Sequence, residues 1–262
     1  MAPDRIPAVL SIAGSDSGGG AGIQADLKAF AKVGVHGMTA VTAITAQNTV
    51  GVAAVEAVSP RIIVAQVRAV AEDIGVDAVK IGMLGTAETV DAVVEALGHV
   101  GDAPVVIDPV MVAESGAVLL DDEARAALVE RLLPLTAVAT PNIPEARVLT
   151  DLGEEASQEE LARAVVALGP EAAVVTGGHS EDLIDLFHDG EQVVEIPGER
   201  HPDGAAHGSG CTHSSALAAY LARGEEPLGA AQKAREIASA AVGGGLREIG
   251  AGPGPVDVFC RG

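Results

Sequence analysis

The sequence predicts an α/β protein with three layers: a doubly wound, mostly parallel central sheet, helices on both faces of that sheet, and an antiparallel hairpin at its edge. Three observations predict this fold class. Short apolar runs alternate with stretches of helical periodicity, which is typical of parallel strands joined by crossover helices. The Asp189-Gly190 pair separates two further strand-like segments, which is a strong hairpin signal. No internal repeat or break in composition divides the chain, so we predict a single domain over residues 1–262.

The apolar runs predict buried strands, and they come at regular intervals along the chain. They cover residues 8–13, 38–44, 78–81, 104–107, 137–140 and 172–176. Helical periodicity, together with capping residues before several of the stretches, predicts the helices. These cover residues 23–33, 60–73, 87–100, 122–133, 159–168, 212–223 and 228–246. The hairpin would pair residues 182–187 with 192–196, and residues 250–262 would form a mobile tail rich in Gly and Pro.

Composition limits the classes of partner. The chain has 16 basic and 37 acidic residues, a net charge of −21, which argues against nucleic acid and anionic membranes. We hypothesise that this acidic surface is adapted to a salty cytoplasm. No basic segment followed by an apolar run opens the sequence, and no apolar segment approaches the roughly 20 residues of a membrane span, so we expect a cytoplasmic protein. The only cysteines, Cys211 and Cys260, predict neither a disulfide framework nor a Cys-rich zinc site.

The segment Gly208-Ser209-Gly210-Cys211 is the most informative one, because it runs directly into a predicted helix. Backbone N–H groups at a helix N-terminus have no intrahelical acceptor and, with the helix dipole, form an anion site suited to phosphate. The same field would favour the Cys211 thiolate, which could then accept a proton from a substrate alcohol. An equally weighted interpretation makes Cys211 a small buried apolar residue.

Other polar residues follow the ends of predicted strands. The Gly-rich loop 14–22 follows the first strand and could wrap a small ligand, although a simple turn is an equal alternative. Asn142 and Glu145 are spaced to face one region from the first turn of a helix, where they could position hydrated Mg²⁺ or merely cap the helix. Asp108 ends a buried strand and needs a partner or a metal. The amide of Gln47 could pair with a ring nitrogen and an exocyclic amine, or cap a turn.

No spacing among the histidines matches a zinc motif. His207 and His213 flank the Gly-Ser-Gly-Cys turn, and His179 follows two glycines. We interpret most of the histidines as surface or loop residues.

Six segments, taken in order, resemble the hydroxymethylpyrimidine and phosphomethylpyrimidine kinases of thiamine biosynthesis, which belong to the ribokinase-like superfamily. The resemblance covers nearly the whole chain. The segments are AGSDSGGGAGIQADLK at 13–28, TAQNTVG at 45–51, KIGML at 80–84, DPVMV at 108–112, TPNIPEA at 140–146 and HGSGCT at 207–212. The resemblance implies a ribokinase-like fold, a homodimer, and ATP with Mg²⁺ as phosphoryl donor. It implies two successive phosphorylations, of a pyrimidine alcohol and then of its monophosphate.

The resemblance also implies site residues. The pyrimidine would be read by Gln47 in a pocket shaped by Gly14, Gly20 and Met83, with Asp26 also on the substrate side.

The remaining roles concern the nucleotide and the transfer itself. Asn142, Glu145, Thr176 and Gly178 would hold the ATP phosphates, with Asp108 and Glu145 on Mg²⁺ directly or through water. Cys211 would be the catalytic base beside the amides of Gly208, Ser209 and Gly210.

Two departures bear on the nucleotide. Thr176 stands where many such kinases have Lys, and residues 201–206 lack the usual Asn-Thr pair. A pyridoxal or pyridoxine kinase on the same fold is the nearest alternative function. A non-catalytic heterocycle-binding module is a second alternative, against which the intact Gly208–Cys211 turn argues.

Overall fold

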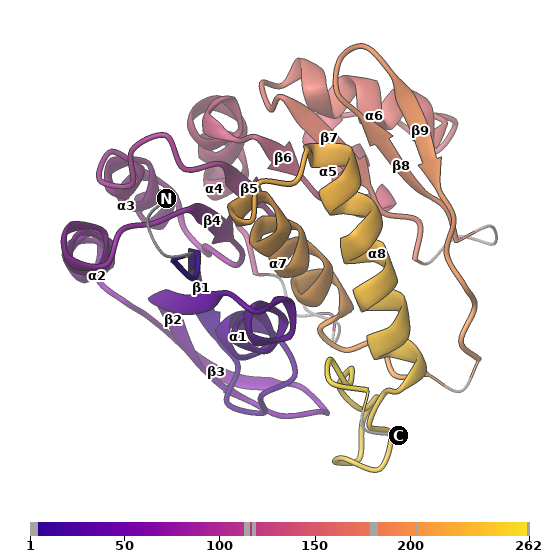
Figure 1. Cartoon of the computed structure of the whole chain (residues 1–262), viewed down its shortest axis with the longest axis horizontal. Coiled ribbons are helices and arrows are strands. Elements are labelled where there is room, and N and C mark those ends of the chain that lie inside the picture. The colour runs from indigo at the N-terminus through magenta and orange to yellow at the C-terminus, as the bar shows by residue number, and fades with distance from the viewer. Residues whose placement is uncertain (1–4, 113–115, 117–118, 179–182, 203, 261–262) are drawn as a thin grey trace.

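The computed structural model describes residues 5–112, 116, 119–178, 183–202 and 204–260. Within them a single sheet of nine strands has the order β3-β2-β1-β4-β5-β6-β7-β8-β9 (Figure 1). Neighbouring strands from β2 to β7 are parallel, whereas β3, β8 and β9 pair in antiparallel fashion at the two ends. The strands are β1 Ala8–Ser15, β2 His36–Gln47, β3 Val52–Ala57, β4 Ala78–Ile81, β5 Val105–Ile107, β6 Val138–Ala139, β7 Ala172–Val175, β8 Asp185–His188 and β9 Val193–Ile196.

Helices cover both faces of this sheet. Ile63 and Val67 of α2 and Val90 of α3 belong to one buried cluster, which also contains residues of α4, α5 and α6. Phe30 of α1 belongs to a second cluster with residues of α7 and α8, and Figure 1 shows α7 and α8 side by side in front of the sheet. The helices are α1 Gly22–Val33, α2 Pro60–Asp73, α3 Ala87–Leu97, α4 Asp122–Ala127, α5 Ile143–Thr150, α6 Gln158–Ala167, α7 Ser209–Ala222 and α8 Pro227–Gly243. The predicted three-layer α/β fold is confirmed.

Burial explains why the central strands were visible in the sequence. In a parallel sheet covered on both faces, side chains on both sides of a strand are removed from water, so each strand is a continuous apolar run. All four residues of β4 are buried, and so are all three of β5. The antiparallel pair β8–β9 is also present, although residue 182, where we began its first strand, lies outside the described residues.

The structure differs from the prediction in three places. Strand β3 was not predicted, because five of its six residues are exposed and give no burial pattern. The stretch predicted as one helix over 122–133 ends as α-helix at Ala127 and continues as a π turn and a 3₁₀ turn to Leu135. Helix α7 begins at Ser209, three residues before the predicted start, so the glycine turn is its first turn.

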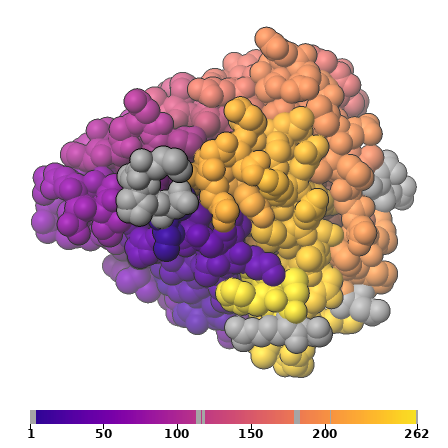
Figure 2. All heavy atoms as spheres, viewed as in Figure 1, coloured from indigo at the N-terminus to yellow at the C-terminus, as the bar shows by residue number. Residues whose placement is uncertain are grey.

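The C-terminal segment is packed, which corrects the prediction of a mobile tail for the part that is described. Val256 and Val258 are buried and pack with Ala241 of α8. The Val256 N–H donates to the carbonyl of His207, and the Gly252 N–H donates to the Thr49 hydroxyl. Figure 2 shows this yellow segment lying against the indigo N-terminal part of the chain. None of the described helices is long and apolar enough to cross a membrane.

Candidate active site

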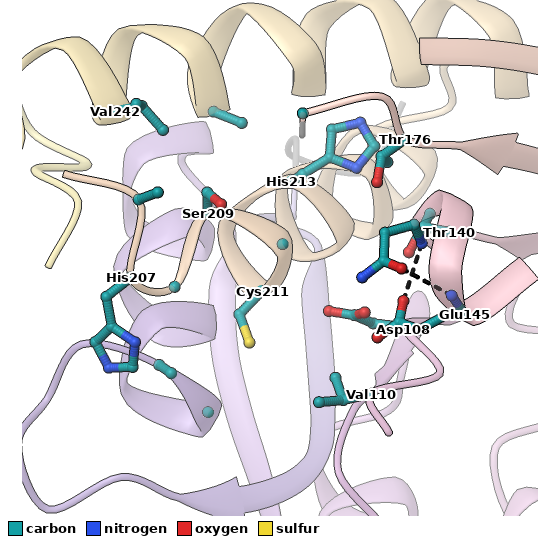
Figure 3. Close-up of a pocket in the computed structure, with 18 of the residues that line it drawn as sticks. Asp108, Val110, Thr140, Glu145, Thr176, His207, Ser209, Cys211, His213 and Val242 are labelled. Carbon is teal, nitrogen blue, oxygen red and sulfur yellow. Dashed lines mark hydrogen bonds between the residues drawn. The ribbon is translucent and has the colours of Figure 1, made fainter. Parts of the chain in front are cut away.

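A cavity of about 490 Å³ opens where the parallel strands end, a size typical of small-molecule sites. Residues that directly follow β5, β6 and β7 line it, together with Met83 beyond the end of β4, and the N-terminus of α7 closes one side. Figure 3 shows Cys211 at that helix end, opposite Asp108 and Glu145, with His207 and Val242 farther along. A doubly wound fold places ligands at this edge of the sheet, because the connections diverge there.

The turn before α7 presents backbone donors to the cavity. Gly208 caps the helix with a left-handed φ of 85°, and no side chain of the residues that the structure describes caps the first turn. The Ser209 N–H donates to the Ala206 carbonyl at 2.9 Å, so this amide is already paired. Among the described residues, no acceptor is found for the N–H groups of Gly210 and Cys211. The anion site that we predicted at residues 208–211 therefore does not include the N–H group of Ser209.

Glycine at position 208 is required by close packing against the loop of residues 14–22. A Cβ at Gly208 would lie 1.8 Å from the carbonyl oxygen of Gly20, and a Cβ at Gly20 would lie 2.3 Å from the His207 ring. Gly20 does not itself line the cavity, which differs from its predicted place in the substrate pocket. Its physical role here is to let the loop touch the helix turn.

Asp16 organises the same loop. Its Oδ1 accepts the Gly18 N–H, and its Oδ2 accepts the N–H groups of Gly20 and Ala21 and lies 3.3 Å from His207 Nε2. Burial would raise the pKa of Asp16, but these hydrogen bonds lower it below its usual value. We predicted no role for Asp16 from the sequence. An acidic residue inside a Gly-rich loop often accepts hydrogen bonds from the backbone N–H groups of that loop, and this pattern could have identified it.

Gly14, Gln47 and Met83 meet on the substrate side of the cavity. A Cβ at Gly14 would lie 3.1 Å from the Met83 sulfur, so the absence of a side chain leaves room for that thioether. The backbone of Gln47 is fixed by Ser17, whose hydroxyl accepts the Gln47 N–H at 2.8 Å and donates to its carbonyl at 2.7 Å. The structure thus brings together three residues that are far apart in the sequence.

Asp26 is not among the residues that line the cavity, so its contact with substrate stays a prediction. Its side chain is fully buried and forms an ion pair with Lys80, 2.9 Å away. The hydroxyls of Ser11 and Ser215 also donate to it, at 2.5 and 2.7 Å. Lys80, in contrast, lines the cavity, and although burial opposes its charge, Asp26 raises its pKa above the usual value.

The surroundings of the Cys211 thiol favour its protonated form, whereas the sequence predicted a favoured thiolate. Burial raises its pKa to about 12, and the charges of Asp108 and Asp26 act in the same direction. Lys80 and a backbone hydrogen bond from Gly22 lower the pKa but do not offset burial. Cys211 is partly exposed at the cavity wall, and the helix N-terminus does not offset the combined effect of desolvation and the two neighbouring acids.

Asn142 and Glu145 form the capping box that was the alternative interpretation, and both also line the cavity. The Glu145 N–H donates to Asn142 Oδ1 at 2.8 Å, and the Asn142 N–H donates to Glu145 Oε2 at 2.9 Å. Burial and the neighbouring charge of Asp108 raise the pKa of Glu145 to about 8. Asp108, 5% exposed, has its own pKa raised by burial, and it accepts a hydrogen bond from Ser214 at 3.1 Å.

These two carboxylates suit a magnesium ion. Both line the cavity, and their negative charge is poorly compensated, which a cation would relieve. No group of three or more metal-ligating residues occurs among the described residues. Mg²⁺ requires no such group, because it retains several waters and takes one or two carboxylates together with nucleotide phosphates.

The predicted nucleotide residues Thr176 and Gly178 line the cavity at the end of β7. His213, of which 4% is exposed, points toward Thr176 in Figure 3. Burial lowers the pKa of His213, which lies 3.9 Å from Asp185. Both His207 and His213 line the cavity. His207 lies in a loop, as we interpreted most of the histidines, whereas His213 is buried in α7 and is an exception to that interpretation. His179 lies outside the described residues.

Comparison with known proteins gives a consistent result. The family model for phosphomethylpyrimidine kinase matches residues 16–257. A hydroxymethylpyrimidine/phosphomethylpyrimidine kinase of Rhizobium meliloti (strain 1021) is 50% identical over 258 residues, covering 96% of this chain and 97% of that protein. A thiamine biosynthesis bifunctional protein of Geobacter sulfurreducens is 44% identical, over 98% of this chain and 53% of its own length.

Among solved structures, the pyridoxal kinase of Staphylococcus aureus in complex with AMP-PCP and pyridoxal has a TM-score of 0.89 and 32% identity, covering 98% of this chain and 95% of that one. The chain therefore belongs to the phosphomethylpyrimidine kinase family.

Proposed function

We propose that this protein uses ATP to phosphorylate the hydroxymethyl group of hydroxymethylpyrimidine, and then the resulting monophosphate, to give the diphosphate used in thiamine biosynthesis. The names of its relatives support this substrate class. The observation that carries the proposal is the pair of N–H groups at Gly210 and Cys211, for which the described part of the chain supplies no acceptor. They face the same cavity as Gln47 on one side and the two buried carboxylates on the other.

The protein's contribution to transfer is chiefly position and charge. In the transition state of in-line phosphoryl transfer, negative charge is spread over the equatorial oxygens of the transferring group, and preorganised amides stabilise this charge without reorganisation. The Gly210 and Cys211 N–H groups perform this role at the N-terminus of α7. Gln47 holds the ring so that the hydroxymethyl oxygen points toward them, which converts the reaction into one between fixed partners.

Asp108 and Glu145 would hold Mg²⁺, directly or through water, and Asn142, Thr176 and Gly178 would contact the nucleotide. When bound, the ion supplies charge neutralisation for the phosphates. Lys80, held by Asp26, adds fixed positive charge at the floor of the cavity.

Cys211 stands beside the amides and is the group available to accept the hydroxyl proton. Because the pKa of its thiol is raised to about 12, the thiol must first give its own proton to solvent water in the cavity, so we assign the base a smaller effect than the amides. We expect Cys211→Ala to lower kcat by roughly 100-fold, the low end for general-base catalysis, and to remain active. Unchanged turnover in that variant would remove the base role from Cys211.

The proposed function is tested by measuring ADP release in a coupled assay and identifying the products by mass spectrometry. We expect ADP release to require both Mg²⁺ and hydroxymethylpyrimidine, and the products to be first the monophosphate and then the diphosphate. ADP release that does not depend on the pyrimidine would refute the proposal.

Pyridoxal phosphorylation is the second candidate. The likeness to a pyridoxal kinase solved with pyridoxal supports it, since that ring also bears a hydroxymethyl group. Comparing kcat/KM for the two alcohols under the same conditions decides between them. A higher value for the pyrimidine supports the first assignment.

We also propose that the chain is a single domain that acts in the cytoplasm as a homodimer. Exposed apolar side chains at the β2–β3 edge support the dimer: Ile44, Val50 and Val55 are 58, 65 and 48% exposed. An unprotected edge strand is a natural surface for a second copy. Sedimentation analysis of wild type and Val55→Lys tests this; a monomeric wild type would contradict it.

A further inference from the structure

The hydrogen-bonding pattern that Gln47 offers to a ligand depends on which way its carboxamide is turned. The two ends of a carboxamide have nearly the same shape, so the surrounding hydrogen bonds decide which one is oxygen. The backbone of Gln47 is already fixed by Ser17. The remaining freedom is the rotation of the side chain and its terminal amide.

Thr45 is the side chain that contacts this amide. Its hydroxyl lies 2.8 Å from the Ser15 carbonyl oxygen and 3.2 Å from the Gln47 carboxamide, at the Oε1 position. Thr45 is 6% exposed, so water does not compete freely for these partners. Ser15 belongs to β1 and Thr45 to β2, where the register between the two strands shifts.

A threonine hydroxyl has one proton and two acceptor lone pairs. That proton cannot serve two oxygens, and the Ser15 carbonyl is both the nearer acceptor and one that cannot turn away. The hydroxyl oxygen is then left as an acceptor toward Gln47. Two oxygens that both lack a proton repel, so the carboxamide nitrogen is the end that must face Thr45.

We infer that Thr45 is a specificity-determining residue: it orients the Gln47 carboxamide so that one N–H and the carbonyl oxygen, side by side, face the substrate. With the opposite orientation the positions of the donor and the acceptor would be exchanged, because the carbonyl oxygen keeps a second lone pair beside an N–H. This inference deepens the proposed function and rests on it for the identity of the substrate.

The pattern of one donor beside one acceptor matches an aminopyrimidine. In that ring a nitrogen that accepts lies next to an exocyclic amine that donates, so both bonds form at once. Pyridoxal has no exocyclic amine and cannot use the carboxamide oxygen in the same way. A site built for a paired donor and acceptor disfavours a ligand that leaves one of them unmatched.

The test compares Thr45→Val, which keeps the shape and removes the hydroxyl, with Thr45→Ser, which keeps the hydroxyl. We expect Thr45→Val to lower kcat/KM for hydroxymethylpyrimidine by roughly ten-fold, the value of one hydrogen bond, and to change that for pyridoxal by less than about three-fold. Thr45→Ser should retain the wild-type ratio. A loss of packing alone would reduce kcat/KM for both substrates by the same factor. The ratio of the two kcat/KM values therefore distinguishes a change in specificity from a change in stability.

Calorimetric titration without ATP gives a second readout. The probes are hydroxymethylpyrimidine and the same ring without its amine. Wild type should prefer the amine-bearing ring, and Thr45→Val should bind the two with nearly equal affinity. If Thr45→Val does not fold, Thr45→Ala replaces it in both measurements.

An unchanged ratio of kcat/KM and an unchanged binding preference in the folded variant would overturn the inference while leaving the proposed function intact. If wild type phosphorylates neither alcohol, the proposed function fails, and the calorimetric preference still tests the role of Thr45.

Discussion

Gly208→Ala is the substitution that tests the turn before α7 most severely. The new Cβ would lie 1.8 Å from the Gly20 carbonyl oxygen, and contacts below 3.0 Å do not persist. The turn and the loop must therefore separate by about 1 Å, and a displacement of that size at a reacting centre costs on the order of 100-fold in rate. A non-glycine residue at this left-handed φ of 85° costs a further ~1–2 kcal/mol of stability.

Gly224→Ala is the matched control, because it separates the two effects. Gly224 lies just beyond the other end of α7 with a φ of 84°, and no atom among the described residues lies within 4 Å of a Cβ built there. Both variants should lose similar backbone stability in urea denaturation. Only Gly208→Ala should lose roughly 100-fold or more in kcat/KM for ADP release. Equal activities in two folded variants would refute the close packing of the turn as a requirement for catalysis.

The remaining predictions concern buried charge, pH and salt. Lys80→Met leaves the Asp26 carboxylate buried without its cation and should cost roughly 3–5 kcal/mol of unfolding free energy; Asp26→Asn in the same chain should recover part of it. If the unfolding free energy of Lys80→Met lay within about 1 kcal/mol of the wild-type value, the proposed stabilisation of Asp26 by Lys80 would be contradicted. The pKa of Glu145 in the folded protein is raised to about 8 from 4.5. Its contribution to the free energy of unfolding is therefore complete below pH 4.5 and is lost as the pH rises through about 8. Glu145→Gln should therefore flatten the decline in melting temperature of nucleotide-free protein between these pH values, and an unchanged slope would contradict the assignment. The net charge of −21 predicts a higher melting temperature in molar KCl than at low salt, and a flat response would refute self-repulsion as a significant term.

The central strands and the glycine turn were predictable because burial and backbone conformation leave direct marks on the sequence. A strand covered on both faces is an uninterrupted apolar run, as Ala78–Ile81 is apart from its lysine. Gly208 marks a turn where a side chain would interfere, and it does adopt a left-handed conformation.

Strand β3 could not be predicted by the same reasoning. Val52–Ala57 is mostly exposed, so no alternation of apolar and polar residues marks a buried face. It becomes a strand because β2 extends along it and supplies hydrogen-bonding partners from Ala43 to Gln47. Pairing of this kind is a property of the folded chain and not of the segment.

The chemistry of the site was predictable in residue type and less so in charge state. The pairing of Lys80 with Asp26 joins residues 54 positions apart, and the one local signal was a lysine inside a buried strand. Cys211 shows the opposite case, since the helix N-terminus was visible but the burial and the two acids around the thiol were not. Local sequence identifies the groups, whereas tertiary packing determines their pKa values.

The central claim is that the N–H groups of Gly210 and Cys211 bind the phosphoryl group during transfer. The most direct measurement is a crystal structure with Mg²⁺, ADP, hydroxymethylpyrimidine and aluminium fluoride, which mimics the transferring group. We predict fluoride atoms at about 3 Å from the backbone nitrogens of Gly210 and Cys211. The hydroxymethyl oxygen should lie in line with the aluminium fluoride and the leaving oxygen of ADP, and the ring amine should face Gln47. A fluoride group bound elsewhere, with these two amides contacting only water or protein, would contradict it.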